Sequence, residues 1–193
     1  MTDDIKRWLA KDGKIFLDEV GIKERDILLD FGCGEGHYTI PSAKLVGEKG
    51  RVYALDEDGE VLDELMKIAK LESLENIEPI KTSGELKIPM EDESVNVVLL
   101  YDVLHYMDER RKIIDDVYRV MKPGGLLSVY PKHHSSDRPL RGLANLTLKD
   151  IIKEIEEAGF GFEKKYFKRL VHDDNYDMGY ILNFRKGRHN GSF

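Results

Sequence analysis

The sequence predicts an α/β fold built on a mostly parallel sheet, and three observations favour it. Short, mainly apolar runs of strand length recur at residues 26–31, 51–56 and 95–101. The segments between them carry apolar residues at the three- and four-residue spacing of a helix. Glycines directly follow the first run, as they do where a strand turns sharply into a helix. Alternating strands and helices of this kind form a parallel sheet with helices on both faces.

Bulk properties restrict the class of protein. The 193 residues suit one domain with a full hydrophobic core, and 41% hydrophobic and 35% charged residues are normal for a soluble protein. A formal net charge of -7 disfavours binding to a polyphosphate backbone, which is itself negatively charged. The single cysteine forms no internal disulfide and agrees with a reducing compartment, so we expect a cytoplasmic location. The N-terminus lacks the apolar core of a signal peptide, and no apolar run approaches the about 18 residues of a membrane span.

The stretch at residues 27–39, ILLDFGCGEGHYT, is where a ligand would bind such a fold. An apolar strand ends in Asp30, and glycines follow at positions 32, 34 and 36 before a helix starts. Gly32 and Gly34 let the backbone turn and approach a ligand where a Cβ would clash. The helix then points its unpaired N–H groups at the same place.

The spacing of these glycines separates two kinds of nucleotide site. A dinucleotide fingerprint reads GxGxxG, whereas this loop reads GxGxG with an acid just before it. This pattern resembles motif I of the class I S-adenosylmethionine (SAM)-dependent methyltransferases. The resemblance implies a Rossmann-like fold, SAM as cofactor, and cofactor contacts at Asp30, Gly32, Cys33, Gly34 and Gly36. A tight turn in an unrelated α/β protein is the alternative.

The N-terminal elements agree with this arrangement. Residues 3–20 are expected to form a helix, with Asp3 as its N-cap and Gly13 as a kink or break. In the family a leading helix often folds over the cofactor, but we interpret Trp8 and Phe16 as ordinary packing residues. A second helix is expected at 37–46, and a third at 58–71.

The strand at 51–56 ends in a second acid. Asp56 lies at the spacing where a carboxylate accepts both hydroxyls of a ribose, and Glu57 follows it. Negative charge here argues against a 2′-phosphate and therefore against NADP. The alternative role for Asp56 is the N-cap of the helix at 58–71.

A third strand is expected at 77–80, followed by an adenine-contact loop. Many SAM enzymes carry an aspartate in this loop, which here reads Thr82-Ser83-Gly84-Glu85. Because the aspartate is missing, Ser83, Gly84 and Glu85 are the candidates for the adenine contact. The missing aspartate leaves undecided which residue contacts the adenine, but the resemblance to the family remains.

The fourth strand, at 95–101, is apolar throughout and is expected to be buried on both faces. Ligands bind past the carboxyl ends of such strands, so Tyr101 is a candidate cofactor contact. A helix at 108–121 capped by Asp108 and a Pro-Gly turn into strand five follow. The resemblance covers residues 25–131 and extends to the group that includes the ubiquinone and menaquinone C-methyltransferases.

The C-terminal third predicts a polar loop and a hairpin. Thr147 is expected to cap a helix at 148–158, and strands at 161–171 and 178–186 are expected to form an antiparallel pair. Members of the family end in such a pair, which completes a seven-stranded, mostly parallel sheet. We expect one domain over residues 1–187, with 1–21 as a helical cap and 188–193 as a disordered tail.

The expected reaction is methyl transfer from SAM to a small-molecule acceptor. His105, just past strand four, is the candidate general base, although it could instead bond the backbone at a helix start. Arsenite methyltransferases need several cysteines, and this chain has one. Catechol-type enzymes bind magnesium with acids after strands four and five. Asp102 could serve there, but no partner acid follows Tyr130.

The remaining alternatives concern metals and partners. We expect no metal site, because His133, His134 and Asp137 more commonly indicate a polar loop than an ion. Basic residues at 164, 165, 168 and 169, and also at 138 and 141, keep an RNA acceptor as the second candidate, although the acidic total argues against nucleic acid. A non-catalytic SAM-binding protein is the third. The chain is expected to act as a monomer or homodimer.

Overall fold

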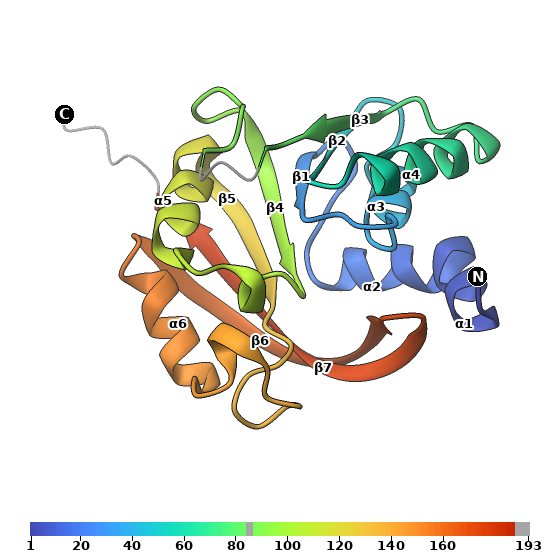
Figure 1. The fold of residues 1–193 in the computed structure, drawn as a ribbon. Helices are drawn as coiled ribbons and strands as arrows, with labels where there is room; N and C mark the ends of the chain where they lie inside the picture. The colour runs from blue at the N-terminus through green and yellow to red at the C-terminus, as the bar shows by residue number, and fades with distance from the viewer. Residues whose placement is uncertain (84–86, 188–193) are drawn as a thin grey trace.

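The computed structural model describes residues 1–83 and 87–187, which form a seven-stranded sheet (Figure 1). The strand order is β3-β2-β1-β4-β5-β7-β6. Neighbours from β3 to β5 pair in parallel, and β7 pairs antiparallel with both β5 and β6. The strands are β1 (Ile27–Phe31), β2 (Arg51–Asp56), β3 (Ile77–Lys81), β4 (Val95–Tyr101), β5 (Met121–Tyr130), β6 (Phe160–His172) and β7 (Asn175–Lys186). The predicted sheet and its terminal antiparallel hairpin are confirmed.

Helices cover both faces of the sheet. The helices and helical turns are α1 (Asp3–Arg7), the π-helical turn η1 (Trp8–Asp12), α2 (Gly13–Glu19), α3 (Thr39–Val46), α4 (Gly59–Leu71), the 3-10 turn η2 (Leu104–Tyr106), α5 (Arg110–Val120), the 3-10 turn η3 (Arg141–Leu143) and α6 (Leu148–Glu156). Figure 1 shows α1 to α4 on one side of the sheet and α5 and α6 on the other. Within the described ranges, no helix has the length and apolar character needed to cross a bilayer.

The two faces bury separate hydrophobic cores that meet only through the sheet. In β4, Val97 and Leu99 pack into the core beneath α1 to α4, whereas Val98 and Leu100 pack into the core beneath α5 and α6. This two-sided burial explains why the sequence of β4 is apolar without alternation. Each core packs one face of the sheet against its helices. Because β1 to β5 are parallel, their carboxyl ends share one edge.

The N-terminal helix is continuous where a break was expected. Thr2, not Asp3, is the N-cap, because its side chain accepts the Ile5 N–H. Gly13 lies inside the helical segment, and a Cβ there would come within 2.7 Å of Pro41 in α3. Gly13 therefore permits close packing of α2 on α3. It lies where the π-helical turn η1 passes into α2, so the predicted break is wrong and the predicted kink stays a prediction.

Two other boundaries differ from the prediction. Helix α5 begins at Arg110, and neither Asp108 nor the N-cap residue Glu109 makes a side-chain cap bond. The hairpin strands run on to His172 and from Asn175, so a two-residue turn replaces the expected six-residue connection. The predicted cap of α6 is confirmed, since Thr147 and Asp150 form a capping box. The expected tail lies outside the described residues, and the domain limits stay a prediction.

Candidate functional site

The glycine loop, residues 32–38, connects β1 to α3 and is held against the end of β2. Gly32, Gly34 and Gly36 have positive φ values of 71°, 49° and 83°, which are strained for any residue with a Cβ. The Gly32 and Cys33 N–H groups both donate to the Leu55 carbonyl, at 2.8 and 3.0 Å. The loop is thus positioned by the backbone of the neighbouring strand.

The three glycines serve different purposes. A Cβ at Gly36 would collide with Leu65 of α4, and one at Gly32 would lie 2.5 Å from Val103 Cγ1. These two glycines allow the loop to pack closely against Leu65 and Val103 of the same chain. A Cβ at Gly34 would meet no atom within 4 Å. Gly34 is therefore the position where the loop faces open space and a ligand can approach the backbone.

Asp56 supports that position from the end of β2. Its Oδ2 accepts the Gly34 N–H at 2.8 Å, and its Oδ1 accepts the Asp58 N–H at 3.0 Å. The N-cap of α4 is Asp58, whose carboxylate accepts the Glu60 N–H. The alternative role of Asp56 as N-cap is therefore wrong. Each carboxylate oxygen keeps a second lone pair for a ligand hydroxyl.

Asp30 lies beneath the loop and is only 3% exposed. It accepts a hydrogen bond from the Thr39 hydroxyl at 2.6 Å, which joins the end of β1 to the start of α3. Burial raises the pKa of this carboxyl to about 6, and the nearby negative charge of Asp56 acts in the same direction. A cation bound nearby would stabilise the ionised form.

The two acids fit a cationic ligand with a ribose better than a phosphate. Across residues 1–83 and 87–187, no lysine or arginine is hydrogen-bonded or ion-paired with Asp30 or Asp56. Together with the open position at Gly34, this arrangement fits an adenosyl sulfonium, whose charge is positive and whose ribose offers two hydroxyls.

The other predicted cofactor residues are arranged around the loop. Glu57 and Ser83 are exposed at the ends of β2 and β3, whereas Gly84 and Glu85 lie outside the described residues. Cys33 is buried, and burial raises the pKa of its thiol, so it fills space as a neutral group. Their roles stay predictions.

Tyr101 lies within an aromatic layer. Its hydroxyl is 2.8 Å from Ser128 Oγ, and its ring meets Tyr38 edge-on with 4.7 Å between the ring centroids. The Tyr38 hydroxyl in turn donates to the Val171 carbonyl at 2.6 Å. Tyr101 therefore connects the start of α3 to the carboxyl ends of β4 and β6, and its cofactor contact stays a prediction.

A second group of polar side chains gathers beside the loop, and we call it the Asp102 cluster. It consists of Asp102, His105, His133 and His172, which come from four different segments. Strands β4, β5 and β6 point the same way in the sheet, so their carboxyl ends, which carry these residues, meet at one edge. The cluster touches the loop through Val103, the neighbour of Gly32.

Asp102 is at the centre of this cluster. Its Oδ2 lies 3.0 Å from His172 Nε2, and its Oδ1 lies 3.6 Å from His105 Nδ1 and 3.8 Å from His133 Nε2. The hydrogen bond that His172 donates to Asp102 raises the pKa of His172, whereas burial lowers the pKa of His105. His105 is thus held as a neutral imidazole at the edge where ligands bind.

Comparison with known families identifies the kind of domain that carries this site. A family model described as methyltransferase domain matches residues 29–129, more than half of the chain. The chain belongs to the methyltransferase domain family. The matched segment runs from β1 through β5 and includes both acids, the glycine loop and Asp102.

Individual relatives agree with this assignment. A crystal structure of a SAM-dependent methyltransferase from Aquifex aeolicus shares 28% identity, with 94% of this chain and 93% of that one covered and a TM-score of 0.75. A demethylmenaquinone methyltransferase of Lactobacillus johnsonii is 30% identical over 60% of this chain and 48% of its own length. An arsenite methyltransferase of Halobacterium salinarum is 33% identical over 54% of this chain and 26% of its own. The predicted class I SAM methyltransferase family is confirmed, although this chain spans less than half the length of both curated relatives.

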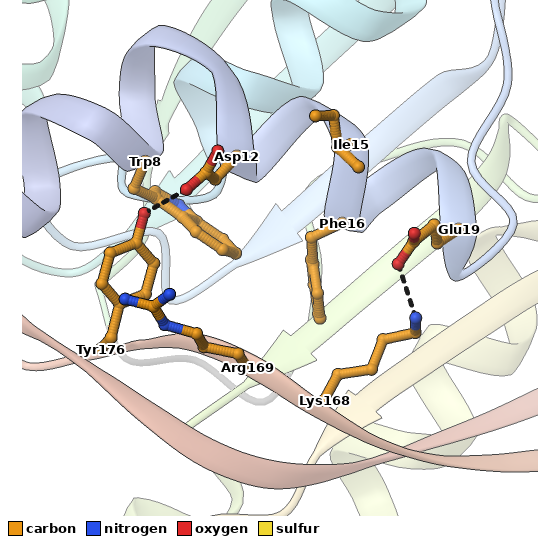
Figure 2. Close-up of a pocket in the computed structure, with 8 residues that line it drawn as sticks. All are labelled: Trp8, Asp12, Ile15, Phe16, Glu19, Lys168, Arg169 and Tyr176. Carbon is orange, nitrogen blue, oxygen red and sulfur yellow. Dashed lines mark hydrogen bonds and ion pairs between the residues drawn. The ribbon is translucent and has the colours of Figure 1, made fainter.

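The methyltransferase domain has a cleft between its N-terminal helices and the hairpin (Figure 2). The cleft has a volume of about 240 Å³. It is lined by Trp8, Asp12, Ile15, Phe16, Glu19, Lys168, Arg169 and Tyr176. Polar groups pair across it: the Tyr176 hydroxyl donates to Asp12 at 2.7 Å, and Lys168 pairs with Glu19 at 2.5 Å. None of these residues was predicted as part of the site.

An aromatic layer separates the cleft from the glycine loop of the methyltransferase domain. Trp8 and Phe16 pack on each other with 5.3 Å between ring centroids, and both lie against Tyr38. The Trp8 indole N–H donates to the His37 carbonyl at 2.7 Å. The predicted packing role of Trp8 and Phe16 is therefore confirmed, and the N-terminal helix covers the loop through them.

Proposed function

We propose that this chain transfers the methyl group of SAM to a small-molecule acceptor. The observation that carries the proposal is the open backbone position at Gly34, which lies beside two carboxylates that have no cationic partner among the residues the structure describes. Family membership and the named relatives support the same chemistry. When bound, SAM supplies an activated methyl group on a positively charged sulfur.

The cofactor half of the site consists of the glycine loop, Asp30 and Asp56. Asp56 accepts the ribose hydroxyls through its free lone pairs while it keeps the Gly34 N–H in place. Asp30 supplies the negative charge that favours a cationic ligand over a neutral one. Because the loop is already held by Leu55 and Asp56, little ordering is needed on binding.

The acceptor half is the edge that carries the Asp102 cluster. The wall formed by Tyr38 and Tyr101 lies next to it, and the covering N-terminal helix keeps water from the reacting atoms. Where an acceptor must lose a proton, the neutral imidazole of His105 is the proposed group that takes it. We propose a monomer or homodimer acting in the cytoplasm, which the single buried cysteine supports.

An RNA acceptor has less support. The exposed cations on β6 are engaged with the protein's own side chains: Lys164 lies over Tyr166, Arg169 lies over Tyr176, and Lys168 pairs with Glu19. The formal net charge is -7. A phosphate backbone would therefore meet few free cations here and a repulsive overall field.

The test uses SAM with a deuterated methyl group and an extract of small metabolites. We expect mass spectrometry to find a metabolite that gains the labelled methyl group with the native chain and not with Gly34→Val. Binding of SAM is measured in parallel by calorimetry. Binding without any labelled product would favour a non-catalytic SAM-binding protein, and absence of binding would overturn the proposal.

A further inference from the structure

The Asp102 cluster leaves lone pairs facing one another where hydrogen bonds would be expected. His133 shows this most clearly, because its Nδ1 lies 2.9 Å from the Arg138 carbonyl oxygen. A carbonyl only accepts, so the ring proton of neutral His133 is on Nδ1. Its Nε2 then carries a lone pair, and this lone pair faces the Asp102 carboxylate at 3.8 Å. Two acceptors in this position repel each other, and either a second ring proton on Nε2 or a metal ion between the two atoms relieves that repulsion.

His105 adds a third unsatisfied group from a buried position. Its side chain is 1% exposed, and neither ring nitrogen has a hydrogen-bond partner among the described residues. The facing Asp102 Oδ1 is also buried without a partner. Leaving a buried polar group unpaired costs roughly 1–3 kcal/mol, so the three buried unpaired atoms of Asp102 and His105 need an explanation.

The spacing of these atoms fits a shared metal ion. One atom each from Asp102, His105 and His133 forms a set in which all lie within 4.8 Å of one another. Two ligands of a tetrahedral zinc ion, each at about 2.1 Å, are about 3.4 Å apart. The 3.6 and 3.8 Å separations from Asp102 Oδ1 are close to that value and too long for hydrogen bonds.

The surrounding contacts are those that hold metal ligands in place. A metal-bound histidine commonly donates its other ring N–H to a backbone carbonyl, as His133 does to Arg138. A metal-bound carboxylate is commonly held by a further hydrogen bond, which His172 supplies to Asp102 Oδ2 at 3.0 Å. Both ligands are thus oriented by groups outside the set.

We propose that Asp102, His105 and His133 bind a divalent transition-metal ion, with His172 as the residue that positions Asp102. Two imidazoles and a carboxylate suit Zn²⁺, Fe²⁺ or Co²⁺ and are poor ligands for Mg²⁺, which prefers oxygen. Three protein ligands leave coordination positions open. In this assignment the His105 lone pair binds the ion in the metal-loaded chain, so His105 takes a proton from an acceptor only in the metal-free chain. The site also replaces the expectation of no metal.

A second set of potential metal ligands lacks the buried, unpaired atoms of the Asp102 cluster. Glu35, His37 and Asp174 also bring one atom each within 4.8 Å, but both acids are exposed and water can solvate them. None of these three is among the buried atoms without a partner. This set therefore serves as an internal control for adventitious binding.

The experiment measures metal binding by the full chain after chelator treatment and dialysis. Calorimetric titration with Zn²⁺ is expected to give one ion per chain, whereas Mg²⁺ gives no uptake at the same concentrations. Co²⁺ is expected to give visible absorption bands of a site with nitrogen and oxygen ligands. This readout does not depend on methyl transfer, so the two proposals can fail separately.

Substitutions distinguish the proposed metal ligands from neighbouring residues that do not bind the ion. Asp102 and His133 have positive φ values of 56° and 69°, and asparagine adopts this conformation readily, so Asp102→Asn and His133→Asn keep the backbone. Each is expected to weaken Zn²⁺ binding by more than about 100-fold, and His172→Gln by about 10- to 100-fold.

The matched controls are His134→Gln and Asp174→Asn. His134 is buried next to His133 but points elsewhere, since its Nδ1 accepts the Ser136 N–H. Both controls are expected to bind Zn²⁺ as the native chain does. No stoichiometric uptake by the native chain, or unchanged affinity in Asp102→Asn and His133→Asn, would overturn the proposal. Calorimetry with S-adenosylhomocysteine checks that each variant is folded and reports on the cofactor half independently.

Discussion

The glycine loop and the Asp102 cluster touch each other but satisfy their polar groups in opposite ways. In the loop, the Gly32, Cys33 and Gly34 N–H groups all have partners in β2, supplied by Leu55 and Asp56. In the cluster, Asp102 Oδ1 and both ring nitrogens of His105 are buried without a partner. The named N–H groups of the loop are all paired within the protein, whereas polar atoms of the cluster are left unpaired.

This difference indicates how each half contributes to function. A loop that is held by the backbone offers a ligand a preformed surface, so binding costs little ordering. A cluster of unpaired groups lowers the stability of the free protein and gains most when a partner arrives. The comparison therefore predicts that a change at the open position of the loop acts mainly on binding. Replacing an unpaired polar group of the cluster should instead raise the stability of the metal-free protein.

The largest expected effect is that of Gly34→Val. The new side chain meets no protein atom at its Cβ but fills the open space beside the loop. We expect calorimetry to show about a thousandfold or greater loss of SAM affinity, about 4 kcal/mol. The matched change Gly36→Ala places its Cβ against Leu65 and should lower stability with a smaller effect on affinity. Normal SAM binding by folded Gly34→Val would contradict the assignment of this surface.

The same two regions explain what could be predicted from the sequence. The loop residues fall in one short stretch, and Asp56 follows at a spacing set by one helix and one strand. The local sequence pattern was therefore enough to predict the loop residues and Asp56 as site residues. The sheet could be predicted for the same reason, since its central strand is apolar throughout.

The cluster could not be predicted, because three of its four members come together only through the sheet. His133 follows β5 and His172 ends β6, and the strand register of the hairpin brings them to Asp102. The expected strand ended at residue 171, which left His172 in a connection. His133 was weighed as a metal ligand together with His134 and Asp137 and was interpreted as part of a polar loop, because nothing in the sequence pairs it with Asp102. The signal in the sequence was the presence of histidines near the ends of three strands.

Asp30 provides the next largest effect, through the pH dependence of stability. Burial raises the pKa of its carboxyl from an ordinary 3.8 to about 6 in the folded chain. Below about pH 4 the group is protonated in both states, and above about pH 6 it is ionised in both. The folded state therefore loses about 3 kcal/mol relative to the unfolded state as pH rises through this window.

Asp30→Asn should remove this loss while its side-chain oxygen still accepts the Thr39 hydroxyl. Urea unfolding is measured without ligand. Between about pH 4 and pH 7, the free energy of unfolding of the variant is expected to rise by about 3 kcal/mol relative to that of the native chain. SAM should bind this variant more weakly, because the negative charge is gone. A stability difference that does not change with pH would show that Asp30 is not a penalised buried charge.

Asp56→Ala tests the support of the loop and is expected to have a somewhat smaller effect. The change removes the acceptor of the Gly34 N–H and the proposed partner of the ribose hydroxyls. We expect SAM affinity to fall by about 1–3 kcal/mol, roughly 5- to 150-fold. Asp58→Ala, which removes only the α4 cap, should lower stability by about 1 kcal/mol and leave affinity unchanged. Equal affinities for the two variants would remove Asp56 from the cofactor half.

The smallest effect expected is a gain in stability on changing His105. Replacing this buried, neutral ring with leucine removes two unpaired nitrogens and keeps an apolar side chain against Tyr106 and His133. In the presence of a chelator, we expect His105→Leu to unfold at a temperature about 2–4 °C higher, for a gain of about 1 kcal/mol. Adding Zn²⁺ should reverse the order, because only the native chain binds the ion through all three ligands. A lower unfolding temperature in chelator would mean that the His105 nitrogens are already satisfied in solution, and the contrast between the complete loop and the incomplete cluster would then be lost.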